Sequence, residues 1–252
     1  MKKLIALTVL TFLLVACSSN KDELAAYRHK TSAEIFNGAE KALAKKKYGD
    51  AVKGFEALDA IYPFGPYAQQ GQLDIIYAYY KNDDDPSAIA AADRYIRLYP
   101  RGKYVDYAYY MKGIISSTEG YTWLQKKFNV DQSERSLTNQ KQAFLAFSEI
   151  VTLYPRSQYA ADSLLRMRYL RNIIARHSLE VAEFYFNHKA YVASANRASY
   201  VVRHFNGTPA VIDALAMMVK SYRKLGLTHL ANNSYKILQA SYPNSEVYKK
   251  LS

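Results

Sequence analysis

One short pattern occurs five times along the chain and limits the fold more than any other feature. Each copy ends in an aromatic residue that is followed by a proline or, once, by an asparagine. Proline lacks a backbone N–H and disfavours helix at the residue before it, so a helix is expected to end at each of these positions. The five stops are Tyr62-Pro63, Tyr99-Pro100, Tyr154-Pro155, Phe205-Asn206 and Tyr242-Pro243.

The residues ahead of the stops agree in register, which five unrelated helices would not be expected to do. Eleven positions before each aromatic residue stands a small residue, where two helices can approach closely: Ala51, Ala88, Ala143, Ser194 and Ala231. Four positions before it stands a large apolar residue: Leu58, Tyr95, Ile150, Val201 and Leu238. The stops lie 37, 55, 51 and 37 residues apart, and the two shortest spacings are close to the tetratricopeptide period of about 34 residues. The sequence therefore predicts an all-α fold, an α-solenoid of about five tetratricopeptide (helix-turn-helix) repeats.

Hydrophobic spacing and turn residues place the helices of these repeats. The expected helices cover residues 32–46 and 49–61 in the first repeat, 104–118 and 139–154 in the third, and 158–188 and 191–205 in the fourth. The second and fifth repeats are expected over residues 66–99 and 208–242, and the last residues should form a short tail. The run Asp83-Asp84-Asp85-Pro86 lacks the spacing of a calcium-binding loop and is interpreted as a turn and helix cap.

The first residues are predicted to be removed. Lys2 and Lys3 precede an apolar run that is too short to span a bilayer, so residues 1–16 are interpreted as a signal peptide. The run ends at Cys17, the only cysteine in the chain, in a sequence that resembles the lipobox of bacterial lipoproteins. A lone thiol fits acylation better than a disulfide or a metal site. An ordinary signal peptide with an incidental cysteine is the alternative.

Lipid on Cys17 would hold the rest of the chain at a membrane, since each buried CH₂ group contributes about 0.8 kcal/mol. Ser18, rather than aspartate, follows the cysteine, and in the lipoproteins it resembles this implies the outer membrane. Residues 17–30 are polar and are expected to be a lipidated tether. Residues 31–252 are expected to be a single repeat domain, with N-terminal repeats over 31–100 and C-terminal repeats over 101–252.

The chain carries a formal charge of +12, and the excess lies in its C-terminal half. Residues 118–252 hold twice as many basic as acidic side chains, whereas residues 18–117 are nearly balanced. The basic half suggests an acidic partner surface or anionic lipid. Nucleic acid is excluded as the expected partner because the chain should be exported.

No catalytic pattern stands out in the sequence. The five histidines are scattered, and no phosphate-binding loop or paired-carboxylate motif accompanies them. We therefore expect no enzyme, no cofactor and no metal site. Between the two helices of the third repeat, residues 119–138 form an insertion that includes Trp123, the only tryptophan. It is expected either to pack back on the repeats or to contact a partner.

Four stretches, together with the lipobox and the repeats, resemble the BamD family of lipoproteins in the outer-membrane β-barrel assembly machinery. They are YPFGPYAQQGQLDIIYAYYKN (62–82), DRYIRLYP (93–100), KFNVDQSER (127–135) and YPRSQYAADS (154–163). The resemblance implies a scaffold at the periplasmic face of the outer membrane that docks on the POTRA domains of BamA. It also implies recognition of the C-terminal segments of unfolded outer-membrane proteins. BamC-type and BamE-type lipoproteins bind family members in some lineages, and the sequence does not decide whether they do so here.

Two surfaces are predicted to carry these contacts. An aromatic and amide-bearing surface in the N-terminal repeats is expected to bind substrate, and its residues are Tyr62, Phe64, Tyr67, Gln70, Asp74 and Tyr77. Packing inside the repeat is the alternative, above all for Tyr77. The resemblance implies that Arg197 meets the last POTRA domain, whereas a solvated arginine is the alternative. Arg203, on the same predicted helix, and Trp123, in the insertion, are predicted as further partner contacts. A different scaffold, a periplasmic repeat lipoprotein that organises peptidoglycan or division enzymes, remains the second interpretation of the whole chain.

Overall fold

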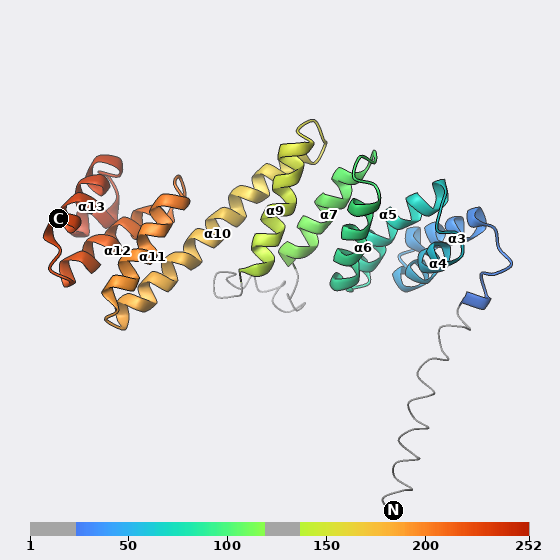
Figure 1. Cartoon of the computed structure of the whole chain (residues 1–252), viewed down its shortest axis with the longest axis horizontal. Coiled ribbons are helices and arrows are strands. Elements are labelled where there is room, and N and C mark those ends of the chain that lie inside the picture. Colours follow the sequence, from blue (N-terminus) through green and yellow to red (C-terminus); the bar gives the residue numbers. More distant parts are fainter. Residues whose placement is uncertain (1–23, 119–136, 252) are drawn as a thin grey trace, which may run out of the picture. The chain divides into compact units, whose positions relative to one another are not determined.

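The computed structural model describes residues 24–118 and 137–251, and the regular elements in these ranges are all α-helices (Figure 1). The predicted signal peptide, Cys17 and Trp123 lie outside the described residues. None of the helices in the described ranges is both long and apolar enough to cross a membrane. The chain divides into two compact units, residues 1–115 and 116–252. A single domain over residues 31–252 therefore stays a prediction, and the two units are treated separately below.

The first unit is built from helices that follow one another with short turns. They are α3 (Ser32–Ala44), α4 (Tyr48–Ile61), α5 (Pro66–Lys81), α6 (Asp85–Leu98) and α7 (Val105–Thr118), whose last residues pass the unit boundary. α3 begins with a capping box, in which Thr31 Oγ1 accepts a hydrogen bond from the Glu34 N–H while the Glu34 carboxylate accepts one from the Thr31 N–H. α5 packs against α3, α4 and α6 and is therefore the central helix of this part of the unit.

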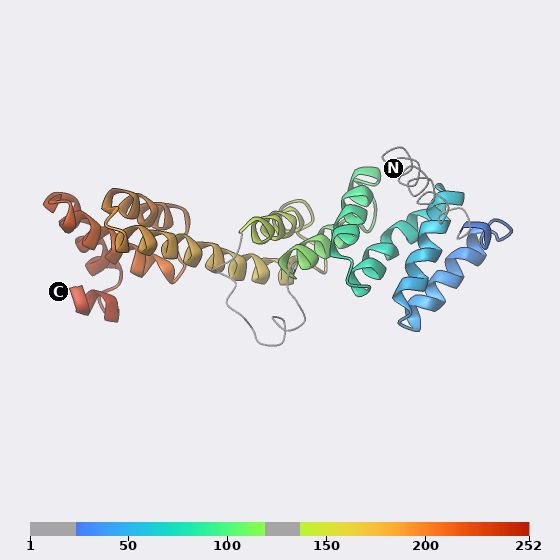
Figure 2. The ribbon, with the colours of Figure 1, turned by 90° about the horizontal axis from the view of Figure 1, so that it is seen from below.

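The second unit is organised on its longest helix. Its elements are α9 (Thr138–Leu153), α10 (Ala160–Asn187), α11 (Tyr191–His204), α12 (Ala210–Lys224), α13 (Thr228–Ser241) and α14 (Glu246–Leu251). α10 has 28 residues, which at 1.5 Å per residue gives a length of about 42 Å. It packs against α9, α11 and α12, and Figure 2 shows α9 and α11 against different stretches of it.

The second half of α10 supplies the main core of this unit. Ile174, Ala175 and Leu179 are buried against α11 and α12, together with Val201 and Met217. The predicted tail forms α14, whose apolar residues pack on Leu215 and its neighbours in α12. The one long helix therefore serves two successive repeats, which explains why the fourth repeat exceeds the tetratricopeptide period.

The register predicted from the sequence is confirmed. The five small residues are at most 2% exposed, and the five large apolar residues four positions before the stops are at most 1% exposed. Every stop aromatic residue is the C-cap of its helix, and its N–H donates to the carbonyl oxygen of that large residue. The prediction of an all-α fold of tetratricopeptide-type repeats is thus confirmed at the level of individual positions.

The helix boundaries agree with the predictions to within about two residues, and the differences have local causes. The helix predicted over 32–46 ends at Ala44 because Lys46 takes a left-handed conformation with φ of 59°. The predicted turn and cap at the acidic run is confirmed. Asp83 has φ of 58°, and the Asp84 side chain accepts a hydrogen bond from the Ser87 N–H at 3.1 Å.

Candidate functional site

The six residues predicted to bind substrate lie on α5 and on the turn that precedes it. Tyr67, Gln70, Asp74 and Tyr77 are three or four positions apart on α5 and so share one face of the helix. Phe64 projects from the turn and is 89% exposed. Tyr62 caps α4, and its hydroxyl donates to the Lys30 carbonyl oxygen at 2.9 Å. Through this hydrogen bond, Tyr62 also links the end of α4 to the segment that precedes α3.

The face of α5 that carries Tyr67 is joined to α3. The ring centroids of Tyr67 and Phe36 lie 5.4 Å apart, and Phe36 in turn lies 6.2 Å from Phe55. Tyr67 is still 40% exposed. Its ring is thus held in place by α3 while part of it remains available to a ligand.

Tyr77 fits the packing alternative better than the binding hypothesis. It is half-buried against the core that Leu73, Ile76 and Met111 form. The ammonium group of Lys81 lies 5.6 Å from the centre of its ring. Tyr77 therefore contributes mainly to the fold, although its role in binding stays a prediction.

Gln70 and Asp74 form a hydrogen-bonded pair beside a second acid. Gln70 Nε2 donates to both carboxylate oxygens of Asp74, at 2.9 and 3.0 Å. Burial raises the pKa of Asp74 to about 7; the hydrogen bond from Gln70 acts to lower this pKa, and the negative charge of Glu40 acts to raise it. Burial also raises the pKa of Glu40, and its Oε1 has no hydrogen-bond partner among the described residues.

These contacts define what we call the α3/α5 face, made of Phe36, Glu40, Tyr67, Gln70 and Asp74. It combines aromatic rings, an amide and two carboxyl groups whose pKa values are raised by burial. Sequence reasoning missed Phe36 and Glu40. Their spacing of four residues places them on one side of α3, but nothing in the sequence indicates that this side meets Asp74.

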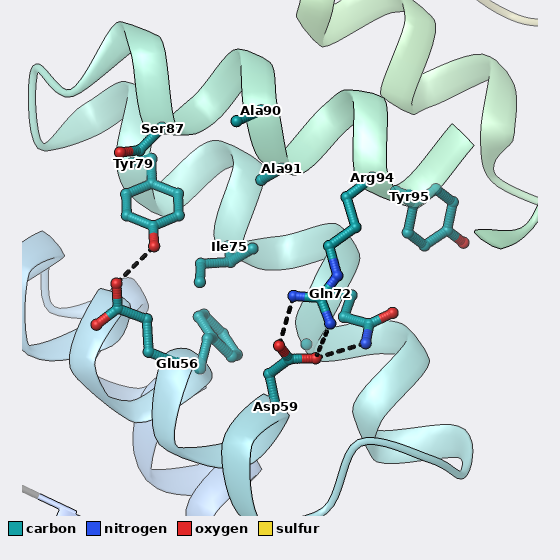
Figure 3. Close-up of a pocket in the computed structure, with 12 residues that line it drawn as sticks. Glu56, Asp59, Gln72, Ile75, Tyr79, Ser87, Ala90, Ala91, Arg94 and Tyr95 are labelled. Carbon is teal, nitrogen blue, oxygen red and sulfur yellow. Dashed lines mark hydrogen bonds and ion pairs between the residues drawn. The ribbon is translucent and has the colours of Figure 1, made fainter. Parts of the chain in front are cut away.

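A cavity of about 300 Å³ lies on another side of α5, between α4 and α6 (Figure 3). None of the six predicted residues lines it. Its walls carry Glu56 and Asp59 from α4, Gln72 and Tyr79 from α5, and Arg94 from α6. The repeat pattern predicted the three helices around this cavity, but the sequence held no signal for the space between them.

Polar side chains tie the three helices together at one end of the cavity. Arg94 donates to both oxygens of Asp59, at 2.6 and 3.0 Å, and Gln72 Nε2 donates to Asp59 Oδ1 at 2.6 Å. On the opposite wall, the Tyr79 hydroxyl donates to Glu56 Oε1 at 2.6 Å. Because Asp59 accepts from both α5 and α6, this cluster fixes α4 relative to its two neighbours.

In the second unit, Arg197 lies on the exposed side of α11. No hydrogen bond or ion pair of Arg197 occurs within the described ranges, whereas Arg203 Nε donates to the Ser199 carbonyl oxygen at 3.4 Å. Tyr200, one turn from Arg197, stacks on His204 with 4.5 Å between the ring centroids. Among the described residues, Arg197 is therefore an unpaired cation, one helical turn from the exposed ring of Tyr200. Trp123, the third predicted partner contact, lies outside the described residues.

No group of three or more histidine, cysteine, aspartate or glutamate side chains within residues 24–118 and 137–251 is arranged to hold a metal ion. The polar clusters described above lack a nucleophile paired with a general base. They can recognise a polypeptide through hydrogen bonds, ion pairs and aromatic contacts.

Comparisons with known proteins identify the family of this chain. The family model YfiO, described as outer membrane lipoprotein, matches residues 28–248. The outer membrane protein assembly factor BamD of Neisseria meningitidis serogroup B is 35% identical, and the match covers 99% of this chain and 95% of that protein. Proteins of the same name from Haemophilus influenzae and Vibrio cholerae are 32% and 34% identical, over 95% and 90% of this chain and 90% and 93% of those proteins.

Similarity to solved structures is weaker. The type IV pilus biogenesis factor PilW matches 88% of this chain and 82% of its own chain, with a TM-score of 0.37 and 14% identity, too low to add to the assignment. The family model and the curated relatives together show that this chain belongs to the BamD family of outer membrane lipoproteins, whose curated members are named outer membrane protein assembly factors.

Proposed function

We propose that this protein is a lipid-anchored assembly factor that joins the POTRA domains of a BamA-type barrel protein to unfolded outer-membrane proteins. The observation that carries the proposal is the match to BamD assembly factors over nearly the whole length of both chains. The lipid is attached at Cys17, and the protein works at the periplasmic face of the outer membrane as a scaffold rather than as an enzyme. Accessory lipoproteins of the BamC and BamE type are further partners where they are present.

The second unit docks the POTRA domains through α11. Arg197 supports this role because it is exposed and unpaired among the described residues, beside Tyr200. An arginine can donate two parallel hydrogen bonds to one carboxylate, which suits a partly desolvated contact better than a lysine does. The excess of basic side chains in residues 118–252 steers an acidic partner toward this unit.

The first unit receives the substrate at the α3/α5 face and at the turn with Phe64. An unfolded barrel protein offers an extended segment with aromatic and apolar side chains and unsatisfied backbone groups. The rings of Phe36 and Tyr67 can stack on such side chains, and Gln70 can exchange hydrogen bonds with a backbone. The partly buried acids Asp74 and Glu40 favour neutral or cationic groups over acidic ones.

Purification of the tagged protein from detergent-solubilised envelopes tests the proposal. Mass spectrometry should identify a POTRA-containing barrel protein in stoichiometric amounts, together with any accessory lipoproteins. Recovery of peptidoglycan-synthesising or division enzymes in place of the barrel protein would overturn the proposal and support the alternative scaffold.

A further inference from the structure

A groove in the first repeat is lined by lysines from three separate segments. It has a volume of about 330 Å³ and lies between α3, α4 and the residues that precede α3. Gly38, Ala39, Ala42 and Gly54 leave room for it, because none of them carries a side chain larger than a methyl group. The charged residues that line it are Lys30, Lys41, Lys45, Lys47, Glu34 and Asp50.

The lysine side chains of this groove are available to a ligand. Those of Lys41, Lys45 and Lys47 are exposed and make no hydrogen bond or ion pair within the described residues. The ammonium group of Lys30 lies 4.9 Å from the centre of the Tyr27 ring, which brings no opposite charge.

The two acids do not neutralise the lysines. The Glu34 carboxylate accepts hydrogen bonds from the N–H and the hydroxyl of Thr31 in the capping box of α3. Asp50 stands in the first turn of α4, where an acid complements the helix macrodipole. Neither acid forms an ion pair with a groove lysine in the described part of the chain. Four lysines against two acids leave an excess of positive charge.

Helix energetics explain only part of this cluster. Lys41 and Lys45 stand at the C-terminal end of α3, where a cation complements the macrodipole. Lys47 is the N-cap of α4, a position that favours serine, threonine, aspartate or asparagine and where the macrodipole disfavours a cation. Because Lys47 does not stabilise the helix that it begins, its place at the groove points to a role in binding.

The groove also lies near the predicted lipid anchor. The described chain begins at Leu24, seven residues after Cys17. Seven residues span at most about 25 Å, and Tyr27, three residues further on, lines the groove. An acyl chain on Cys17 therefore keeps the groove close to the membrane surface.

We propose that this α3/α4 lysine groove binds the phosphate groups of anionic phospholipids in the membrane that holds the anchor. Lysine provides three N–H donors on a compact cation, which suits a phosphate. Lysines next to an anionic membrane surface are attracted to it over about one Debye length. The contact orients the first repeat toward the bilayer, whereas the lipid on Cys17 keeps the chain attached. The choice of a phospholipid as the occupant rests on the anchor in the proposed function.

Flotation with lipid vesicles tests the groove on the mature Cys17→Ala chain, residues 17–252, which carries no acyl chain. At low salt it should bind vesicles of phosphatidylcholine that contain about a third phosphatidylglycerol. It should not bind vesicles of phosphatidylcholine alone, whose headgroup has no net charge. High salt should release the bound protein, because the contact is electrostatic.

Substitutions connect the binding to the groove. The combined variant Lys41→Gln, Lys45→Gln, Lys47→Gln should lower the affinity for the anionic vesicles on the order of 100-fold, at about five-fold per lysine. The same three positions changed to arginine keep the charge and should retain binding. Asp50→Asn removes an opposing charge and should strengthen binding about two- to five-fold. Circular dichroism checks that each variant is folded.

A matched control removes the same charge from the second unit, at exposed lysines of α12, α13 and α14. The combined variant Lys224→Gln, Lys236→Gln, Lys250→Gln should lower the affinity by less than about three-fold. Equal losses from the two combined variants would overturn the proposal, because net charge rather than the groove would then bind the membrane.

Three further results would overturn it. These are equal binding to both kinds of vesicle, release by inorganic phosphate but not by chloride of the same ionic strength, and binding of a glutamate-rich peptide in place of the vesicles. The second would assign the groove to free phosphate and the third to an acidic protein. None of them would bear on the POTRA contact, which is tested separately by copurification.

Discussion

At the scale of single residues, Asp74 is an acid whose pKa is strongly raised by burial. Its carboxyl lies beside Glu40 and accepts two hydrogen bonds from Gln70. Burial and a neighbouring acid both disfavour the charged form. The pKa of Asp74 is raised from 3.8 to about 7. Between about pH 4 and pH 7, the folded protein therefore keeps a proton on Asp74 that the unfolded chain has released.

This proton predicts a pH dependence of stability. The free energy of unfolding should fall as the pH rises from about 4 to 7, because the native state binds more protons than the unfolded state in this range. Asp74→Asn should remove this pH dependence and should be more stable than the unaltered protein at pH 8. The gain in the free energy of unfolding should be a few kcal/mol at most, because each pKa unit corresponds to about 1.4 kcal/mol. Urea unfolding at pH 5 and pH 8 measures the difference.

Asp83→Asn provides the control for this series, since Asp83 is an exposed turn residue with positive φ that asparagine also tolerates. It should not alter the slope of stability against pH. An Asp74→Asn variant with the same slope as the unaltered protein would show that Asp74 is charged throughout the range.

Arg197 belongs to the same scale. Arg197→Leu should weaken binding of the isolated POTRA fragment by about 2–5 kcal/mol, because the acid that it meets is left buried and unpaired. The unfolding temperature should barely change, since Arg197 makes no hydrogen bond or ion pair within the described ranges. Isothermal titration calorimetry measures the affinity.

Charge reversal of the facing acid should partly rescue Arg197→Glu and should not rescue Arg197→Leu. Arg101→Leu, an exposed arginine of the first unit, is the matched control and should bind normally. If Arg197→Leu retained the affinity of the unaltered protein, Arg197 would not lie in the interface.

At the scale of elements, two glycines inside helices distinguish the effect of close helix packing on stability from the effect of helix propensity. A Cβ atom on Gly54 of α4 would lie 2.8 Å from the Ala39 Cβ of α3, whereas a Cβ on Gly38 of α3 would meet no atom within 4 Å. Gly38→Ala should therefore stabilise the protein by about 0.5–1 kcal/mol, the usual gain in a helix interior. Gly54→Ala should destabilise it by about 1–3 kcal/mol, because the two helices must move apart.

Thermal and urea unfolding of the two variants provide the test, and each variant is the control for the other. Equal stabilisation by both changes would mean that α3 and α4 do not approach as closely as the structure shows.

The sequence specified the elements well because each repeat marks its own buried positions. Ala51, Leu58 and Tyr62 follow the same spacing as their counterparts in the other repeats, and one helix face is buried wherever that spacing occurs. Contacts between different helices were not predictable in this way. That Glu40 faces Asp74, and that a cavity remains between Glu56 and Arg94, depends on how helices pack in space.

The predicted functional residues show the same division. Phe64 and Arg197 are exposed, as a binding role requires. Tyr77 is half-buried against the core, because the three- and four-residue spacing that places it with Gln70 also describes residues that point partly inward. Spacing along one helix identifies a face but not how much of that face its neighbours cover.

At the scale of the whole molecule, the membrane contact is predicted to depend on one residue. Cys17→Ala should leave a protein that is exported and folded but detached from the membrane, because the acyl chains supply its strong membrane contact. Fractionation of envelopes with immunoblotting measures the distribution. Retention of the variant in the outer-membrane fraction after a high-salt wash would contradict this prediction.

Site-specific photo-crosslinking tests most directly the central claim, that the first unit receives unfolded outer-membrane proteins. A photoreactive amino acid at Tyr62 or Gln70 should capture the C-terminal segment of a newly made barrel protein, and the same probe at Ala240 of α13 should not. A barrel protein with a scrambled C-terminal segment should be captured several-fold less. Equal capture of the intact and scrambled segments, or capture at Ala240 alone, would contradict the account.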